Sequence, residues 1–202
     1  DDANALFHLQ GKDVSYLFTI LKNQQLGHLY FGKKLRQHNI IPHILHFAHT
    51  PWCPGVFEGD EAFSLDYAPQ EYPAYGKSDF RHPAYQVQCE DGNTITDLTY
   101  VSHSIIPGKP KLEGLPATYV ANEDEAATLE ITMKDEYLDL DIILSYTVYE
   151  AYNVITRSVR FENRGSQTLR LLRALSMSLD SPDADFEMLQ LSGAWGRERH
   201  LW

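Results

Sequence analysis

Ala127-Thr-Leu-Glu-Ile-Thr-Met-Lys134 is the stretch that decides the fold. Apolar side chains at positions 127, 129, 131 and 133 alternate with polar ones at positions 128, 130, 132 and 134. Side chains of a β-strand point alternately to its two faces, so this alternation predicts a strand with one buried and one solvated face. Residues 138–149 repeat the pattern, with Leu140, Ile142, Leu144 and Tyr146 in phase.

Strand patterns continue on both sides of these two runs. They cover residues 14–21, 26–31, 85–89, 94–106, 154–161, 168–179 and 186–191. The turn sequence 90–93 predicts a hairpin with 94–106 as its return arm. The run 168–179 places Leu169, Leu171, Leu175 and Met177 on one face. Strands separated by turn signals, without intervening helical periodicity, indicate an all-β fold: a large antiparallel β-sandwich forming one domain over residues 1–202.

A long segment, residues 41–83, separates the first strands from the rest and is rich in proline, glycine and aromatic residues. Connections of this length are usually functional or disordered. His43, His46, His49 and Cys53 give the spacing H-x-x-H-x-x-H-x-x-x-C, and these residue types can ligate zinc. Prolines at positions 42, 51 and 54 place them in a loop without a regular face that would gather ligands. We therefore interpret them as polar loop residues and predict no metal.

The same segment carries five carboxylates, Asp60, Glu61, Asp66, Glu71 and Asp79. Two carboxylates that face each other can hydrolyse a glycoside, and their separation decides the stereochemical outcome. Loop carboxylates are more often solvated or accept hydrogen bonds in turns. We therefore predict solvated charges and turn formers here. Cys89 alternates within a predicted strand and is interpreted as a small core residue.

The amino-acid composition argues against some classes of partner and favours one cellular location. The chain has 202 residues, 43% of them apolar, and a formal net charge of −11. The acidic surplus argues against nucleic acid and anionic membranes as partners and is compatible with a neutral substrate. Two cysteines are too few for a disulfide framework and favour reduced thiols. With no apolar run of about 18 residues and no basic-then-apolar leader, we expect a cytoplasmic location.

The run Leu191-Ser-Gly-Ala-Trp-Gly-Arg-Glu-Arg-His200 places a tryptophan between two glycines, followed by charge. The glycines allow a tight turn that leaves a face of Trp195 uncovered. Arg197 and Arg199 present planar donors, with Glu198 as a possible partner for them. An apolar ring beside such donors suits a sugar, whose C–H face stacks while its hydroxyls are hydrogen-bonded. The alternative is that Trp195 caps the core and the charges form a solvated cluster.

An ordered set of motifs extends over nearly the whole chain. These are Phe63-Ser-Leu-Asp66, Gln70-Glu-Tyr-Pro73, Tyr75-Gly76, Asp79-Phe-Arg81, Pro83-Ala84, Gly108-Lys-Pro110, Leu115-Pro-Ala-Thr-Tyr119, Thr128-Leu-Glu130, Ile155-Thr-Arg-Ser158, Phe161-Glu-Asn163 and Gly193-Ala-Trp-Gly-Arg-Glu-Arg199. Each motif is weak alone, but the ordered set is specific. The sequence resembles the amino-terminal portion of family 36 glycoside hydrolases, the α-galactosidases.

The resemblance implies a β-supersandwich of the galactose mutarotase-like type, placed ahead of a (β/α)8 catalytic barrel. Such enzymes release terminal α-linked galactose from raffinose-type sugars with retention, using two barrel aspartates and no cofactor. A barrel needs about 250 residues, so we expect this chain to lack both catalytic carboxylates and to be inactive alone. We also expect the sandwich to be incomplete at its carboxyl-terminal end.

The resemblance also implies site residues and partners. The family tryptophan that matches Trp195 reaches the galactose site in tetramers, where the sandwich of one subunit closes the barrel of another. The implied partners are a galactose-containing oligosaccharide, the protein's own barrel and neighbouring subunits. Family members add an acid and an arginine from the loop before Phe63. This chain offers no clear match there, and His49, Trp52 and Glu61 are candidates for a replacement lining.

Two other functions remain open on the residues alone. An autonomous carbohydrate-binding module would need Trp52, Tyr72, Tyr75 and Trp195 on one groove. A sugar epimerase of the galactose mutarotase type would need His103, His200 and Glu198 to converge as acid and base.

Overall fold

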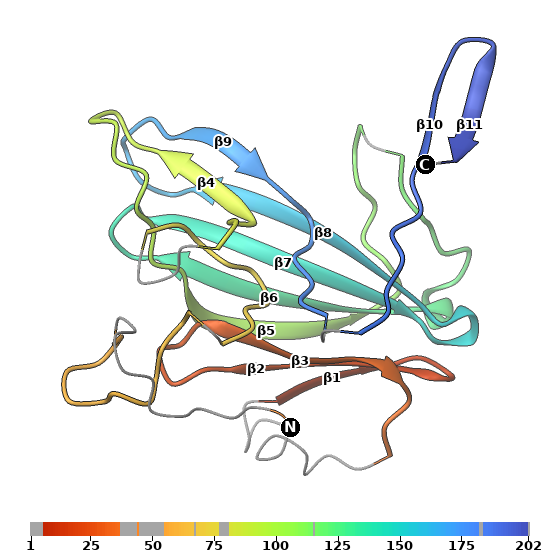
Figure 1. Ribbon diagram of the computed structural model, residues 1–202, viewed down its shortest axis with the longest axis horizontal. Helices are drawn as coiled ribbons and strands as arrows, with labels where there is room; N and C mark the ends of the chain where they lie inside the picture. Colours follow the sequence, from red (N-terminus) through yellow and green to blue (C-terminus); the bar gives the residue numbers. More distant parts are fainter. Residues whose placement is uncertain are drawn as a thin grey trace.

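The computed structural model of the chain describes residues 6–36, 44, 55–66, 68–76, 81–114, 116–181 and 184–201. Figure 1 shows the arrangement of its strands. In chain order, the strands within the described residues are β1 Leu6–Gln10, β2 Val14–Ile20, β3 Leu26–Lys33, β4 Tyr85–Gln88, β5 Thr99–Pro107, β6 Ala127–Asp135, β7 Leu140–Tyr149, β8 Val154–Asn163, β9 Arg170–Ala174, β10 Leu191–Ala194 and β11 Arg197–Leu201. Glu123–Glu125 and Glu150–Tyr152 form short 3-10 helices. No helix in these ranges is long and apolar enough to span a bilayer. The predicted all-β fold is confirmed.

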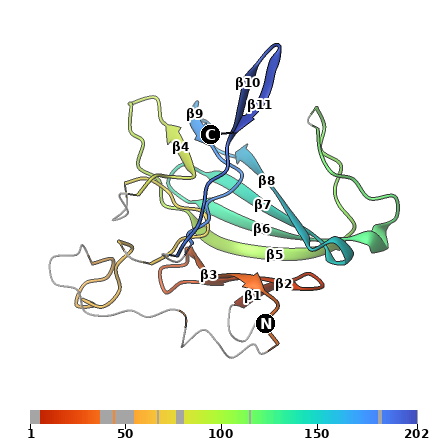
Figure 2. The ribbon, with the colours of Figure 1, turned by 45° about the vertical axis from the view of Figure 1, so that its right-hand side comes forward.

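Two antiparallel sheets form the sandwich. The four-stranded sheet has the order β5-β6-β7-β8, and the three-stranded sheet β1-β2-β3 lies across one of its faces (Figures 1 and 2). At the centre, β6 and β7 pair with Ile131 opposite Leu144 and Met133 opposite Ile142. These four side chains are buried, as the alternation predicts. Thr128 departs from its predicted solvated face, because its hydroxyl is buried between Gly108 O and Thr147 Oγ1.

Aromatic rings join the two sheets. Phe18 of β2 stacks on Tyr146 of β7 with ring centroids 5.0 Å apart, and Phe7 of β1 stacks on Phe18 at the same distance. Offset aromatic pairs of this kind add about 0.5–1.5 kcal/mol to the free energy gained by burying their area. The core therefore lies between β2 and β7, and the loop segment 68–76 adds Tyr72 and Ala74 to it.

The predicted hairpin of residues 85–89 and 94–106 is wrong. The turn itself forms, with Cys89 N donating to Asn93 O at 2.9 Å and Gly92 at φ +87°. However, β4 pairs with β9, not with β5. The chain after the turn satisfies its N–H groups elsewhere, because Thr96 N donates to Tyr75 O and Asp97 N to the carboxylate of Asp135. The prediction of a turn at residues 90–93 is confirmed. The strand pairing was predicted incorrectly, because residues far away in the sequence bind the backbone after the turn.

Other parts of the strand prediction need correction. The sequence pattern missed β11 and also β1, a five-residue edge strand whose Phe7 lies opposite Phe18 of β2. The predicted strand 186–191 is not formed before Leu191, where β10 begins. The predicted strand 168–179 shortens to Arg170–Ala174, and its expected apolar face is largely uncovered: Leu171, Leu175 and Met177 are exposed. Cys89 is buried and carries a free thiol, as predicted for a core residue.

Buried tyrosines make the fold sensitive to alkali. Burial is the main cause that holds the pKa values of Tyr16, Tyr72, Tyr85 and Tyr146 well above the usual value of 10.0. The unfolded chain then loses phenolic protons at lower pH than the folded chain, so the free energy of unfolding is expected to fall as pH rises above about 10. Urea unfolding at pH 8 and pH 11 measures this decrease.

Tyr85→Phe is the test variant, because burial is the largest cause of the raised pKa of the Tyr85 hydroxyl. This variant is expected to reduce the pH dependence. Reversible titration of every phenol near pH 10 at 295 nm, with the chain still folded, would contradict the prediction.

Candidate functional site

The candidate site is the hairpin of β10 and β11. Leu191 lies opposite Leu201 and Ala194 opposite Arg197, with a register irregularity between Ser192 and Ala194. Gly193 lies at this irregularity, and a Cβ there would come within 2.6 Å of Arg197 O. Gly196 adopts φ +77°, a left-handed conformation that favours glycine. Both glycines around the tryptophan are therefore required by the backbone.

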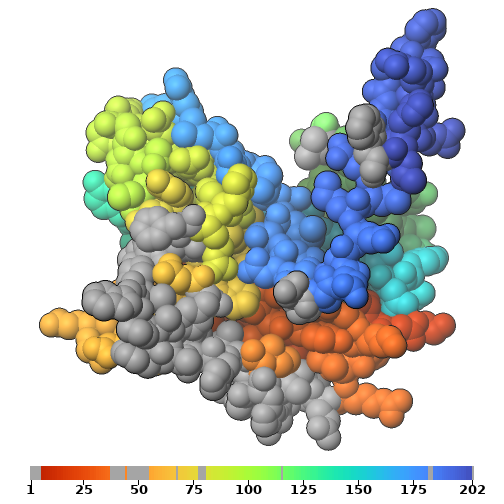
Figure 3. All heavy atoms as spheres, viewed as in Figure 1, coloured from red at the N-terminus to blue at the C-terminus, as the bar shows by residue number. Residues whose placement is uncertain are grey.

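Trp195 stands at the tip of this hairpin. Its exposed fraction is 98%, so the alternative in which it caps the core is wrong for this chain. The hairpin projects from the body of the molecule (Figures 1 and 3). Both faces of the indole are open to a ligand or to another polypeptide.

The charged residues after Trp195 are exposed, but Glu198 binds the backbone of the turn and not the arginines. Glu198 Oε1 accepts the Gly196 N–H at 3.0 Å, which ties the carboxylate to the turn. Arg197 and Arg199 are exposed, and neither guanidinium is paired with a carboxylate in the part of the chain that the structure describes. Two planar cationic donors thus follow the tryptophan on β11 and are exposed, so they can bind hydroxyls or carboxylates.

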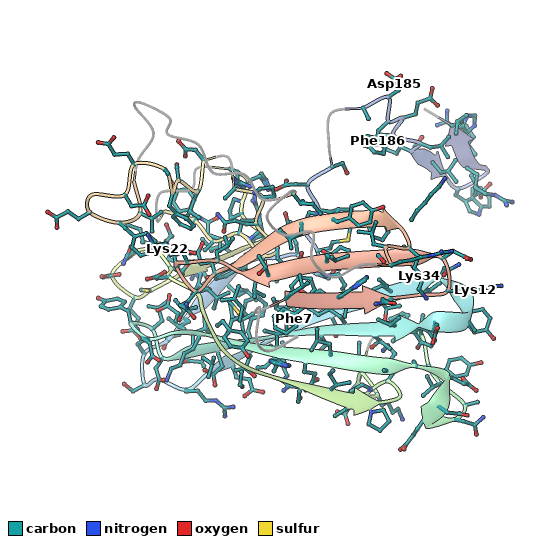
Figure 4. The ribbon with its side chains drawn as sticks, turned by 90° about the horizontal axis from the view of Figure 1, so that it is seen from below. Phe7, Lys12, Lys22, Lys34, Asp185 and Phe186 are labelled. Atoms are coloured by element: carbon teal, nitrogen blue, oxygen red, sulfur yellow. The ribbon has the colours of Figure 1, made fainter. Side chains whose placement is uncertain are left out.

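The hairpin is carried by an arm, defined here as the described residues 175–181 and 184–190. Figure 3 shows a hollow between the lobe of β4 and the hairpin, with residues after β8 along its floor. Asp185 and Phe186 of the arm lie apart from both sheets (Figure 4). Large apolar side chains are exposed in β9 and in the arm: Leu171, Leu172, Leu175, Met177, Phe186, Met188 and Leu189. Exposed apolar residues in this number favour contact with another polypeptide or another domain.

A second feature, which the sequence analysis missed, is a buried ionic cluster around Glu71. This carboxylate was predicted to be solvated, yet it is fully buried. It accepts hydrogen bonds from Tyr16 Oη at 2.6 Å and Tyr146 Oη at 2.9 Å, and pairs with Arg157 Nη2 at 2.8 Å. His28 Nδ1 lies 3.5 Å from it. A buried carboxylate is stable only when compensated in this way, so the prediction for Glu71 is wrong.

Arg157 is the cation of this cluster. Burial alone would lower its pKa, but the phenols of Tyr146 and Tyr16 and the carboxylate of Glu71 raise it. The guanidinium also lies over the Tyr146 ring, 4.7 Å from its centroid. The sequence held a signal for this residue: Arg157 is in phase with Ile155, Val159 and Phe161, which pack on the core. A charge on the apolar face of a strand indicates a buried partner.

The structure also describes other acidic residues of the segment 41–83. Asp60 is a turn former, as predicted, because Oδ1 accepts the N–H groups of Ala62 and Phe63. Asp60 also pairs with Lys22. Glu61 is exposed, and its segment lies away from the β10–β11 hairpin within one chain (Figures 1 and 2). Its role as a lining residue stays a prediction. His43, His46, His49, Trp52, Cys53 and Asp79 lie outside the described residues.

The structure weighs against both alternative functions. Tyr72 is buried, with its ring stacked on Tyr85 at 5.4 Å, so it cannot join an exposed aromatic platform. His103 lines a cavity of about 810 Å³ between β1 and β5, which neither Glu198 nor His200 lines. Those two residues belong to β11, on the projecting hairpin. The acid–base trio of an epimerase is not formed. No group of three metal-ligating residues occurs within the described ranges.

The two sheets and the projecting tryptophan hairpin define an antiparallel β-sandwich that presents an exposed aromatic ring. Residues 24–202 match the Glycosyl hydrolase family 36 N-terminal domain, and the chain belongs to that family.

Relatives with this domain are α-galactosidases. The chain is 51% identical over 198 residues to the α-galactosidase AgaA of Geobacillus stearothermophilus, covering 96% of this chain and 27% of that protein. It is 38% identical to the α-galactosidase Mel36A of Lactobacillus acidophilus, covering 100% and 28%. The crystal structure of AgaA with raffinose superposes with a TM-score of 0.92 at 50% identity, over 98% of this chain and 27% of that one. The chain thus spans about a quarter of the length of these relatives.

Proposed function

We propose that the chain is the accessory amino-terminal sandwich of an α-galactosidase and forms a wall of its sugar site. The observation that supports this most directly is the indole of Trp195, 98% exposed at the tip of a projecting hairpin. The family match gives the class of enzyme. Hydrolysis itself belongs to a catalytic barrel, which supplies the paired carboxylates of a retaining mechanism.

In this proposal the chain binds and orients the sugar. The indole stacks on the C–H face of a terminal galactose, and Arg197 or Arg199 donates to its hydroxyls. AgaA crystallises with raffinose and with stachyose, which supports raffinose-type galactosides as the substrate class. His49, Trp52 and Glu61 are proposed to line the outer side of the pocket.

We also infer a homotetramer, in which the hairpin of one subunit reaches the barrel of its neighbour. The wide projection of the hairpin from its own body supports contact with another polypeptide (Figure 3). A cytoplasmic location is proposed from the low cysteine content, and the one cysteine within the described residues is a free thiol.

Trp195→Ala tests the sugar-site role in the full-length enzyme, defined here as this chain together with its catalytic barrel. Stacking on the indole removes some tens of Å² of apolar area, worth on the order of 1–2 kcal/mol. We therefore expect kcat/KM for raffinose to fall roughly tenfold, and Trp195→Phe to retain part of the activity.

Tyr137→Ala is the matched control, because it removes another exposed aromatic residue, in the turn between β6 and β7. Its kinetics are expected to equal those of the parent enzyme. A Trp195→Ala enzyme with unchanged kcat/KM would remove Trp195 from the sugar site.

A further inference from the structure

The arm that carries Trp195 is held at its base by three donors from the body of the sandwich. Tyr72 Oη donates to Leu175 O at 2.8 Å. Arg157 Nη1 lies 3.5 Å from Ser178 O, and Arg81 Nη1 bonds the carboxylate of Asp180 at 3.2 Å. Beyond this base the large apolar residues of the arm are exposed, Phe186 at 68% and Met188 at 85%.

Two of these donors are held in the core, Tyr72 by a ring stack and Arg157 by the buried cluster. Tyr72 follows Glu71 directly in the chain, and its ring is buried against Tyr85 with the two planes 3° apart. Arg157 is paired with Glu71 on one side and approaches Ser178 O on the other. Glu71 N also donates to Leu26 O at 2.9 Å, which attaches this part of the loop to β3.

From this geometry we propose that Tyr72, held by its ring stack on Tyr85, and Arg157, held by the buried Glu71 carboxylate, are positioning residues for the arm. They set the direction in which the arm leaves the sandwich, and hence the place of the Trp195 indole. This inference rests on the proposed sugar-site role of Trp195 for its kinetic consequence, but the anchoring of the arm does not depend on that role.

The test compares two substitutions of one kind in the full-length enzyme. Tyr72→Phe removes the hydroxyl that holds Leu175 O and keeps the stacked ring. Tyr149→Phe is the matched control, because it removes the hydroxyl of another buried tyrosine, which bonds Thr118 Oγ1 and Tyr119 O and belongs neither to the arm nor to the Glu71 cluster. Arg157→Lys is a second variant, which keeps the charge beside Glu71 and shortens the reach to Ser178 O.

Hydrogen–deuterium exchange gives the structural readout. Tyr72→Phe and Arg157→Lys are expected to speed exchange of peptides from residues 175–181 and 184–201 roughly threefold to tenfold, with β6 and β7 unchanged. Tyr149→Phe should leave the arm peptides as in the parent enzyme. Unchanged arm exchange in both test variants, or an equal rise in Tyr149→Phe, would overturn the proposal.

Kinetics give the functional readout. Tyr72→Phe is expected to lower kcat/KM for raffinose roughly threefold, mainly through KM, and to add nothing further in a Trp195→Ala background. If arm exchange rises while Trp195→Ala leaves kcat/KM unchanged, the anchoring stands and the sugar-site role of Trp195 is lost. If Trp195→Ala lowers kcat/KM but the anchor variants do not, the proposed positioning is wrong.

Discussion

The chain alone is expected to leave p-nitrophenyl α-galactoside intact, whereas a chimera in which it replaces the matching segment of AgaA is expected to hydrolyse it. Retaining hydrolysis needs two carboxylates about 5–5.5 Å apart that both reach the sugar. Glu71, a carboxylate in the interior of this fold, is fully buried and paired with Arg157. The 51% identity and the TM-score of 0.92 make AgaA a suitable recipient.

Binding by the chain alone should be undetectable as well. Stacking on Trp195 contributes on the order of 1–2 kcal/mol, and a millimolar complex requires about 4 kcal/mol. Calorimetry with galactose is therefore expected to show no binding heat. Hydrolysis by the isolated chain would contradict the proposal that the barrel alone supplies the catalytic carboxylates. The cavity lined by Asp124, Glu125 and Glu150 would then be the first place to search for them.

Glu71→Ala is expected to destabilise the chain by about 3–5 kcal/mol, a large share of the 5–15 kcal/mol of a typical domain. The substitution leaves the guanidinium of Arg157, whose side chain is 8% exposed, without its carboxylate. It also removes the acceptor of the Tyr16 and Tyr146 hydroxyls. Urea unfolding followed by circular dichroism measures the loss.

Glu162→Ala is the matched control for this prediction. Glu162 pairs with Arg160 and Arg164, whose side chains are 60% and 58% exposed. Solvent screens such pairs, and their removal costs at most about 1 kcal/mol. Glu71→Gln should fall between the two variants, because an amide keeps one oxygen acceptor without its charge. Equal unfolding midpoints for Glu71→Ala and Glu162→Ala would show that the buried cluster does not stabilise the fold.

The sheet centre could be predicted because its signal is local. Ile131, Met133, Ile142 and Leu144 alternate with polar residues, and strand geometry alone assigns them to one face. The glycines around Trp195 are local as well, since a tight turn requires them whatever surrounds it. The sequence does not distinguish an exposed Trp195 from one that caps the core, because neighbouring residues do not show what covers the ring.

The sequence by itself determined the all-β class, the strands of the central sheet and the motifs that place the chain in family 36. Only the tertiary structure decided that β4 pairs with β9 and that Glu71 is buried. The phenols that bind Glu71 lie 55 and 75 residues away along the chain. A carboxylate is stable in a core only where such partners compensate its charge, and β4 pairs with β9 because the packing of the whole chain brings these strands together. The local sequence pattern therefore does not identify the partners.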